Sequence, residues 1–218
     1  MNEYIALPDA PAKKVVIACH GSGRCAVSYR DVPFYARQKD IALACGCAFA
    51  AVDMGPDTYG TPKGLEILEG FYARIVEEYG FDKSAAFWAS SAGGCAMFNF
   101  AARNPECVAL MLGIFPVWDL KSVTHLKSMR AAWHLNEGEL PPDEYNPACR
   151  LAELPNVPIV IAQGTNDKAV PPEKNSMALK SALGDRVTLF MTADEHSTEA
   201  FGLYETDIFE KALKAYNR

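Results

Sequence analysis

The sequence lacks any hydrophobic run long enough to cross a bilayer. Its longest apolar stretches, such as residues 108–117, are far shorter than the roughly 20 residues that a membrane-spanning helix needs. The first residues, Met-Asn-Glu-Tyr-Ile-Ala-Leu-Pro, have neither the basic start nor the apolar centre of a secretory signal. We therefore expect a cytoplasmic protein that does not act in a membrane.

The sequence also lacks an excess of positive charge. Its formal net charge is −6, its pI is near 5.3, and no run of like charges occurs in it. Nucleic acids and anionic membranes attract basic surfaces, so this balance argues against both as partners.

Signatures of disulfide frameworks and metal sites are absent as well. The seven cysteines are an odd number, scattered along the chain, with no Cys-x-x-Cys pair and no His ligands at zinc-site spacing. Cys45 and Cys47 are predicted to be two buried small residues that flank a helix end, because free cysteine is commonly buried. No metal site is expected.

The chain does have the length and pattern of one α/β domain. With 218 residues, half of them hydrophobic, it is long enough for a single well-buried domain over residues 1–218. Apolar segments typical of buried strands alternate with helical patterns, which predicts an open, mostly parallel sheet of about six strands flanked by helices. The expected strands are residues 13–19, 47–52, 84–89, 107–115, 157–162 and 186–192; the expected helices are residues 33–45, 62–79 and 92–103, one from about 172, and one ending near 216.

Residues 116–155 interrupt this alternation. They include Trp118, Met129 and Trp133 but no clear strand, which predicts a short, mainly helical insertion. An insertion at the carboxyl end of a sheet commonly covers a ligand site, so it is a candidate lid and Trp118 a candidate substrate contact. The alternative is that these side chains only pack the insertion onto the domain.

The most informative stretch is residues 84–103, where a strand turns directly into a helix at Ser91. The pattern Ala89-x-Ser91-x-Gly93-Gly94 is the small-x-Ser-x-small form of a nucleophile elbow. This turn is so tight that the residues two positions before and two positions after the nucleophile must be small. Ser90 is therefore excluded as the nucleophile, because the large Trp88 lies two positions before it. The amide of Ala92, at the helix start, is positioned to donate to an oxyanion. The alternative is that Ser91 is only a helix cap.

A glycine-rich turn follows the first predicted strand as His20-Gly21-Ser22-Gly23. In such a turn the amide of Gly21 or Ser22 is a candidate for the second oxyanion donor. No phosphate-binding motif accompanies the glycines. We expect His20 to hold the loop by a hydrogen bond rather than to act as a base.

Two further polar residues follow later strands. Asp167 comes just after the strand at 157–162, and His196 after the strand at 186–192, so both lie at the sheet edge that carries Ser91. An Asp in such a loop can also be only a turn or a cap. Asp119 is the best alternative acid, because it follows the strand at 107–115.

Taken together, these residues resemble the α/β-hydrolase superfamily, whose catalytic triad follows the chain order Ser, Asp or Glu, His. The most specific parts are the elbow around Ser91, Gly164-x-x-Asp167 and the late His196. The resemblance implies that Ser91 is the nucleophile, His196 the base and Asp167 the acid that orients it, and that no metal or organic cofactor is needed. The short sequence before residue 13 suggests that the first strands of the family are missing.

The resemblance implies a serine carboxylesterase that cleaves small or medium acyl esters, with a small-molecule ester as its substrate. A thioesterase or a small peptidase of the prolyl-oligopeptidase type would use the same triad. A non-catalytic binding protein with the same fold is the alternative from another class.

Overall fold

The computed structural model describes residues 2–218 and places seven strands in one sheet. The strand order is β1-β3-β2-β4-β5-β6-β7. The strands from β2 onward pair in parallel, which confirms the predicted open, mostly parallel sheet. Their bounds are β1 Glu3–Ala6, β2 Val15–Cys19, β3 Ala48–Val52, β4 Ala85–Ser90, β5 Val108–Ile114, β6 Ile159–Gly164 and β7 Val187–Thr192.

The count of about six strands was one too low, because β1 adds an edge strand. It pairs antiparallel with β3, with Glu3 opposite Val52 and Ala6 opposite Phe49. This strand is only four residues long and each of its residues is half-buried. A short edge strand of this kind has neither the continuous apolar run nor the clear alternation that identifies a strand in a sequence.

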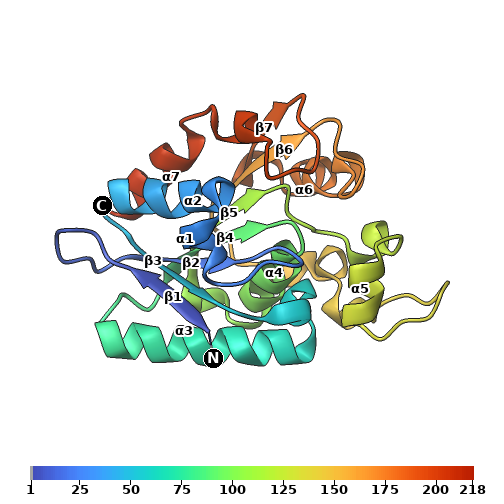
Figure 1. The fold of residues 1–218 in the computed structure, drawn as a ribbon, viewed down its shortest axis with the longest axis horizontal. Coiled ribbons are helices and arrows are strands. Elements are labelled where there is room, and N and C mark those ends of the chain that lie inside the picture. The colour runs from blue at the N-terminus through green and yellow to red at the C-terminus, as the bar shows by residue number, and fades with distance from the viewer. Residues whose placement is uncertain (1) are drawn as a thin grey trace.

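Helices cover both faces of the sheet (Figure 1). Helices α2 (Pro33–Ala44) and α7 (Ile208–Tyr216) pack on one face, and α3 (Pro62–Tyr79) and α4 (Gly93–Arg103) on the other. In β2, Val15 and Ile17 join the core beneath α3 and α4, whereas Val16 and Ala18 join the core beneath α2 and α7. Successive strand residues point to opposite faces, and both faces of β2 are covered, so all five of its residues are apolar and buried.

Helix α3 begins and ends where its sequence signals predict. The Thr61 hydroxyl caps its first turn by accepting a hydrogen bond from the Gly64 amide at 3.2 Å, and Pro62 occupies the first helical position. Gly80 ends the helix in the left-handed conformation, with φ at 64°. Two shorter helices complete the body: α1 (Ser28–Asp31) before α2, and α6 (Ser176–Leu183) before β7.

The insertion at 116–155 contains helix α5 (Lys127–Ala132) and several short 3₁₀ turns, and within the described chain it contributes no strand to the sheet. It stands beside the sheet in Figure 1, at the right of the view. Its apolar side chains, including Val123 and Met129, form a small separate core with Tyr59 and Cys95. The insertion is therefore packed onto the body next to the start of α4.

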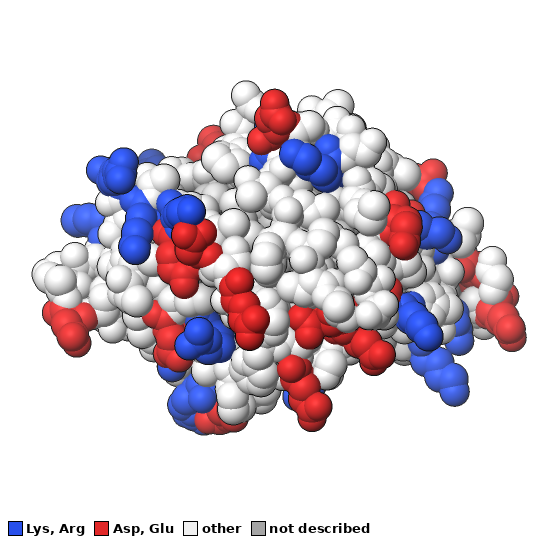
Figure 2. All heavy atoms as spheres, turned by 90° about the horizontal axis from the view of Figure 1, so that it is seen from above, with Lys and Arg blue, Asp and Glu red and all other residues white. Residues whose placement is uncertain are grey.

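Cys45 and Cys47 are buried at the end of α2, as predicted, and the seven cysteines are free thiols. No helix within residues 2–218 is both long enough and apolar enough to cross a membrane. Figure 2, which views the molecule from the top of Figure 1, shows basic and acidic side chains mixed over that face.

Candidate active site

Ser91 occupies the turn between β4 and α4 in a left-handed backbone conformation, with φ at 52°. Its amide donates to the Ile114 carbonyl at 3.1 Å, and its carbonyl accepts from the amides of Gly94 and Val117 at 2.9 and 2.8 Å. Few non-glycine residues adopt a positive φ, and surrounding structure must hold those that do. These three hydrogen bonds fix the Ser91 backbone from both sides of the turn.

Gly93 allows the elbow to form because α4 begins almost in contact with the end of β2. A Cβ atom on Gly93 would lie 2.1 Å from the Cys19 carbonyl oxygen and 2.7 Å from that of His20. Real Cβ atoms do not approach oxygen so closely, so only glycine fits. The small residue that the elbow pattern requires after the serine therefore has a direct steric reason.

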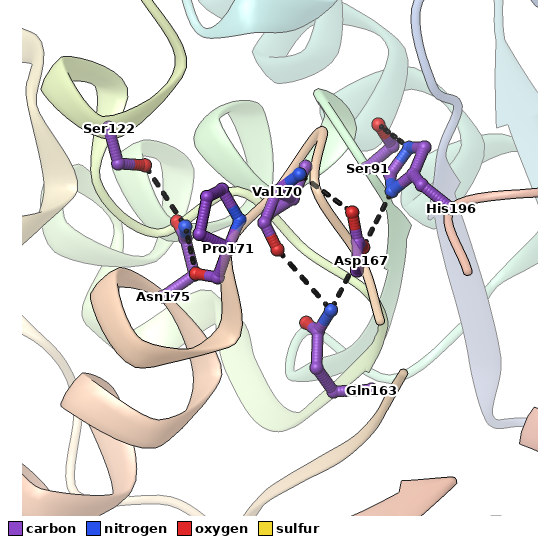
Figure 3. Close-up of polar contacts among 8 residues, drawn as sticks. All are labelled: Ser91, Ser122, Gln163, Asp167, Val170, Pro171, Asn175 and His196. Carbon is purple, nitrogen blue, oxygen red and sulfur yellow. Dashed lines mark hydrogen bonds and ion pairs between the residues drawn. The ribbon is translucent and has the colours of Figure 1, made fainter. Parts of the chain in front are cut away.

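Ser91, His196 and Asp167 form one hydrogen-bonded chain (Figure 3). Ser91 Oγ lies 2.9 Å from His196 Nε2, and His196 Nδ1 lies 2.7 Å from Asp167 Oδ2. A carboxylate only accepts hydrogen bonds, so Nδ1 carries the proton and the Nε2 lone pair faces the serine hydroxyl. The structure thus brings together the three residues that the sequence placed after three different strands.

Asp167 is held by donors other than the histidine. Its side chain is fully buried; Oδ1 accepts from the Val170 amide at 2.7 Å, and Oδ2 accepts from Gln163 Nε2 at 2.9 Å. Hydrogen bonds from these donors fix the orientation of the carboxylate toward His196. Asp119, the alternative acid, instead accepts from the Lys121 amide and from Asn146 Nδ2, and within the described chain it has no hydrogen bond to His196.

Asn175 anchors the loop that carries Asp167. Its side-chain oxygen accepts from the amides of Trp118 and Asp119 at 2.9 and 3.0 Å, and its Nδ2 donates to Ser122 Oγ and the Pro171 carbonyl (Figure 3). The residue is completely buried. The helix that the sequence predicts from about residue 172 is interrupted here: a 3₁₀ turn precedes Asn175 and α6 begins after it.

His20 links two loops at the same edge of the sheet. Its Nδ1 donates to the Gly21 carbonyl at 2.9 Å, and its Nε2 accepts from the Met54 amide at 3.0 Å. Burial lowers the pKa of His20 below its usual 6.5. Asp53 Oδ1 lies 3.6 Å from Nε2, but a nitrogen that accepts from Met54 carries no proton, so the neutral ring fits these contacts better than an ion pair.

The candidate oxyanion donors surround the serine. Gly21 packs so closely that a Cβ atom on it would lie 3.3 Å from Ser91 Cβ, and Ser22 lines the same pocket as Ser91. Ala92 is buried immediately before α4. Within residues 2–218, no backbone oxygen accepts a hydrogen bond from the Ala92 amide. Ala92, Gly21 and Ser22 therefore all adjoin Ser91, and their amides remain the candidate oxyanion donors.

The pocket over Ser91 has a volume of about 320 Å³, near the lower limit of typical ligand pockets. It is lined by Gly21, Ser22, Arg24, Tyr35, Ser91, Phe115, His196, Ser197 and Thr198. Among residues 2–218, no three His, Cys, Asp or Glu side chains are grouped so that they could hold a metal ion.

Neither Trp118 nor the rest of the insertion lines this pocket in the described structure. Trp118 is almost fully buried, and its indole packs edge-on against Phe98, with ring centroids 5.4 Å apart. After β5 the chain runs beside α4, where Val117 lies against Gly94 and Trp118 packs against Phe98. The structure therefore does not support Trp118 as a substrate contact.

Five pocket residues were not predicted from the sequence. They are Ser197 and Thr198, which directly follow His196, and Phe115, Arg24 and Tyr35. The Phe115 backbone has a positive φ of 39°, and its ring centroid lies 4.2 Å from that of His196. Phe115 was predicted to be the last residue of the strand at 107–115, where an apolar side chain is ordinarily expected to join the core, whereas β5 ends at Ile114 and Phe115 begins the turn. Arg24 and Tyr35 reach the pocket from a loop and from α2, which no local pattern indicated.

The fold is that of the α/β-hydrolases. The chain is similar to the solved structure of FphF, a fluorophosphonate-binding serine hydrolase of Staphylococcus aureus, with 14% identity over 99% of this chain and 92% of the other, at a TM-score of 0.78. It is also similar to the S-formylglutathione hydrolase FrmB of the same organism (13% identity, 99% and 92% coverage, TM-score 0.73). Est1E from Butyrivibrio proteoclasticus matches at 16% identity, 98% and 91% coverage and a TM-score of 0.70. No protein-family model and no curated protein matches the sequence.

The steric role of Gly93 predicts a loss of stability on substitution. Gly93→Ala is expected to lower the free energy of unfolding by about 1–3 kcal/mol, because the new methyl group must displace the Cys19 and His20 carbonyls. Gly70→Ala is the matched control. Gly70 is an exposed residue of α3 with open space around its Cβ position, so alanine should raise the same free energy by about 0.5–1 kcal/mol. Urea denaturation measures both; equal effects of the two variants would contradict the steric explanation.

Burial of neutral His20 predicts a pH-dependent contribution to stability. Since its folded-state pKa lies below 6.5, the unfolded chain binds the proton more readily, and stability is lost as the pH falls below about 6.5. His20→Gln should therefore show a smaller loss of the free energy of unfolding between about pH 7.5 and pH 5 than the native chain.

Urea denaturation at the two pH values makes this comparison. His125→Gln, which replaces an exposed histidine, is the control and should keep the native pH dependence. An unchanged pH dependence in His20→Gln would show that His20 is not the group responsible.

Proposed function

We propose that the chain is a serine hydrolase, and specifically a carboxylesterase that cleaves small or medium acyl esters through an acyl-enzyme on Ser91. The observation that carries the proposal is the hydrogen-bonded chain from Ser91 Oγ to His196 at 2.9 Å and on to buried Asp167 at 2.7 Å. The α/β-hydrolase fold and the similarity to structures described as serine hydrolases support it.

In the first half of the reaction, Ser91 Oγ attacks the ester carbonyl carbon while His196 Nε2 takes the hydroxyl proton. The Asp167 carboxylate stabilises the imidazolium that forms and keeps the ring oriented. General base catalysis of this kind is worth about 10²–10⁴ in rate. The buried hydrogen bonds on Asp167 keep this carboxylate fixed while the charge on His196 changes.

The carbonyl oxygen becomes an oxyanion in the tetrahedral intermediate. It accepts hydrogen bonds from the amide of Ala92, which directly follows Ser91 at the start of α4, and from that of Gly21 or Ser22, which line the pocket. One such donor typically lowers the barrier by about 3 kcal/mol. Because these are backbone groups held by the fold, they need little reorganisation during the reaction.

The intermediate collapses as the bond to the leaving alkoxide breaks, and the alkoxide takes the proton from His196. In the second half, water attacks the acyl carbon, again giving its proton to His196, and the bond to Ser91 Oγ then breaks. The carboxylic acid leaves and the serine regains its proton. Chain groups and water supply every proton acceptor and donor in this scheme.

The size of the pocket favours small substrates, because about 320 Å³ leaves little room beyond a short acyl or alcohol group. The same residues can act on thioesters and on aminoacyl amides, so a panel of ester, thioester and aminoacyl substrates with equal acyl chains separates these activities. Higher kcat/KM on the thioester or the aminoacyl amide than on the ester would contradict the carboxylesterase assignment.

The proposal predicts that a fluorophosphonate probe labels Ser91 and no other residue. Intact-mass analysis should show one adduct on the native chain, none on Ser91→Ala and nearly none on His196→Ala, because only an activated serine attacks the phosphorus.

Ser90→Ala is the matched control for the adjacent hydroxyl. Ser90 Oγ is buried and accepts a hydrogen bond from Gln38 Nε2 at 2.7 Å, so this variant should still carry the adduct. No adduct on folded native chain would contradict the hydrolase proposal and favour a non-catalytic binding protein.

A further inference from the structure

Arg24 is the one arginine or lysine side chain that lines the pocket over Ser91 in the described structure. It follows the glycine-rich turn after β2, and its amide donates to the Gly21 carbonyl at 3.2 Å, which closes the turn. The Arg24 residue is half-buried. Its position is therefore set by the same loop that carries the candidate oxyanion donors.

The Arg24 guanidinium lies on an aromatic support, with its central carbon 5.7 Å from the centroid of the Tyr35 ring. Tyr35 is itself only 4% exposed, and it packs edge-on against Tyr29 and Phe34 in the core beneath α2. A stacked guanidinium loses fewer conformations when it binds a ligand than a free one does. Burial raises the pKa of Tyr35, while the charge of Arg24 and a hydrogen bond from its side chain oppose this rise, so the phenol stays neutral beside the guanidinium.

Arg24 has no carboxylate partner within residues 2–218. Four other arginines have one: Arg30, Arg74, Arg103 and Arg150 each form an ion pair with an Asp or Glu. The four arginines that, like Arg24, form no ion pair within the described chain lie outside the lining of the Ser91 pocket: Arg37, Arg130, Arg186 and Arg218. Within the described chain, no carboxylate oxygen lies within the 4.0 Å limit of an ion pair from Arg24. A half-buried guanidinium that has no carboxylate partner, and whose neighbour is the neutral Tyr35 hydroxyl, is open to a negatively charged ligand.

The pocket also holds no negative charge of its own. Its other lining residues are glycine, serine, threonine, tyrosine, phenylalanine and histidine. Asp167, the next carboxylate along the hydrogen-bonded chain, is fully buried behind His196, and its oxygens already accept three hydrogen bonds. A ligand in the pocket therefore meets one positive side chain, several hydroxyl groups and no acidic group.

We propose that the substrate is an ester that carries a carboxylate near its scissile bond, and that Arg24 binds this carboxylate. The proposal rests on the hydrolase function proposed above and names its substrate class. The planar guanidinium fork matches a carboxylate with two parallel hydrogen bonds. Because the pocket is small, an anion on Arg24 places the ester carbonyl next to Ser91 and the oxyanion donors.

The test compares esters that differ in one charge. On the acyl side, the 4-nitrophenyl monoester of glutaric acid is compared with the 4-nitrophenyl ester of glutaramic acid, in which an amide replaces the free carboxylate. On the alcohol side, O-acetylglycolate is compared with O-acetylglycolamide. The measured quantity is the ratio of kcat/KM for the anionic ester to kcat/KM for the uncharged ester with the carboxamide. The pair in which this ratio is high shows whether the carboxylate lies on the acyl or the alcohol side of the scissile bond.

The native chain should prefer the anionic ester in one of the two pairs. Arg24→Gln should reduce that preference ratio by about 10- to 100-fold, the usual effect of losing a charge-assisted hydrogen bond. Arg24→Lys should retain part of the preference, because it keeps the charge but not the fork. Arg37→Gln is the matched control: Arg37 is a residue of α2 outside the lining of the Ser91 pocket, so the ratio should not change.

Equal losses on the anionic ester and the amide in Arg24→Gln would overturn the proposal, because they would mean that Arg24 only packs on Tyr35. Absence of any preference in the native chain would overturn it as well. The uncharged fluorophosphonate probe distinguishes failure of the carboxylate site from failure of the hydrolase function. Labelling of Ser91 without a charge preference refutes the carboxylate site alone, whereas absence of labelling refutes the hydrolase function on which it rests.

Discussion

The geometry of the site depends on how closely the start of α4 approaches the end of β2. With Gly93 nearly touching the Cys19 and His20 carbonyls, the chain has no space for a wider turn, and Ser91 is held at a positive φ. This contact directs the hydroxyl above the sheet edge and brings the Ala92 amide beside it. It also brings the glycine-rich loop after β2 against Ser91, so one steric constraint positions Ser91 and the oxyanion donors proposed for it.

A second layer of buried polar contacts holds the loops that surround the serine. Gln163 and Val170 fix Asp167, Asn175 ties the Asp167 loop to the segment after β5, and His20 joins the loops after β2 and β3. Each group is buried with its partners, and a buried polar group that loses its partner costs about 1–3 kcal/mol. These contacts restrain the loop that carries Asp167 and the glycine-rich turn that carries Gly21 and Ser22.

The sequence predicted the parallel sheet and the turn at Ser91 because both follow from local patterns: buried apolar strands, and small residues at fixed spacing. Chain order after three strands also indicated that Ser91, Asp167 and His196 would meet. The edge strand β1 was missed because four half-buried residues give no periodic signal. Arg24, Tyr35 and the displaced Trp118 could not be assigned from the sequence, because their positions depend on how loops and α2 pack in three dimensions rather than on any spacing in the chain.

The most direct test of the proposed catalytic triad compares Asp167, which follows β6, with Asp119, which follows the neighbouring strand β5. Rates of ester hydrolysis are measured for Asp167→Asn and Asp119→Asn, each checked for native stability. Since Asp167 contacts His196 Nδ1 at 2.7 Å and Asp119 does not, Asp167→Asn should lower kcat by about 10⁴-fold and Asp119→Asn by far less. Full activity in Asp167→Asn, or an equal loss in Asp119→Asn, would contradict the hydrogen-bonded chain as the origin of catalysis.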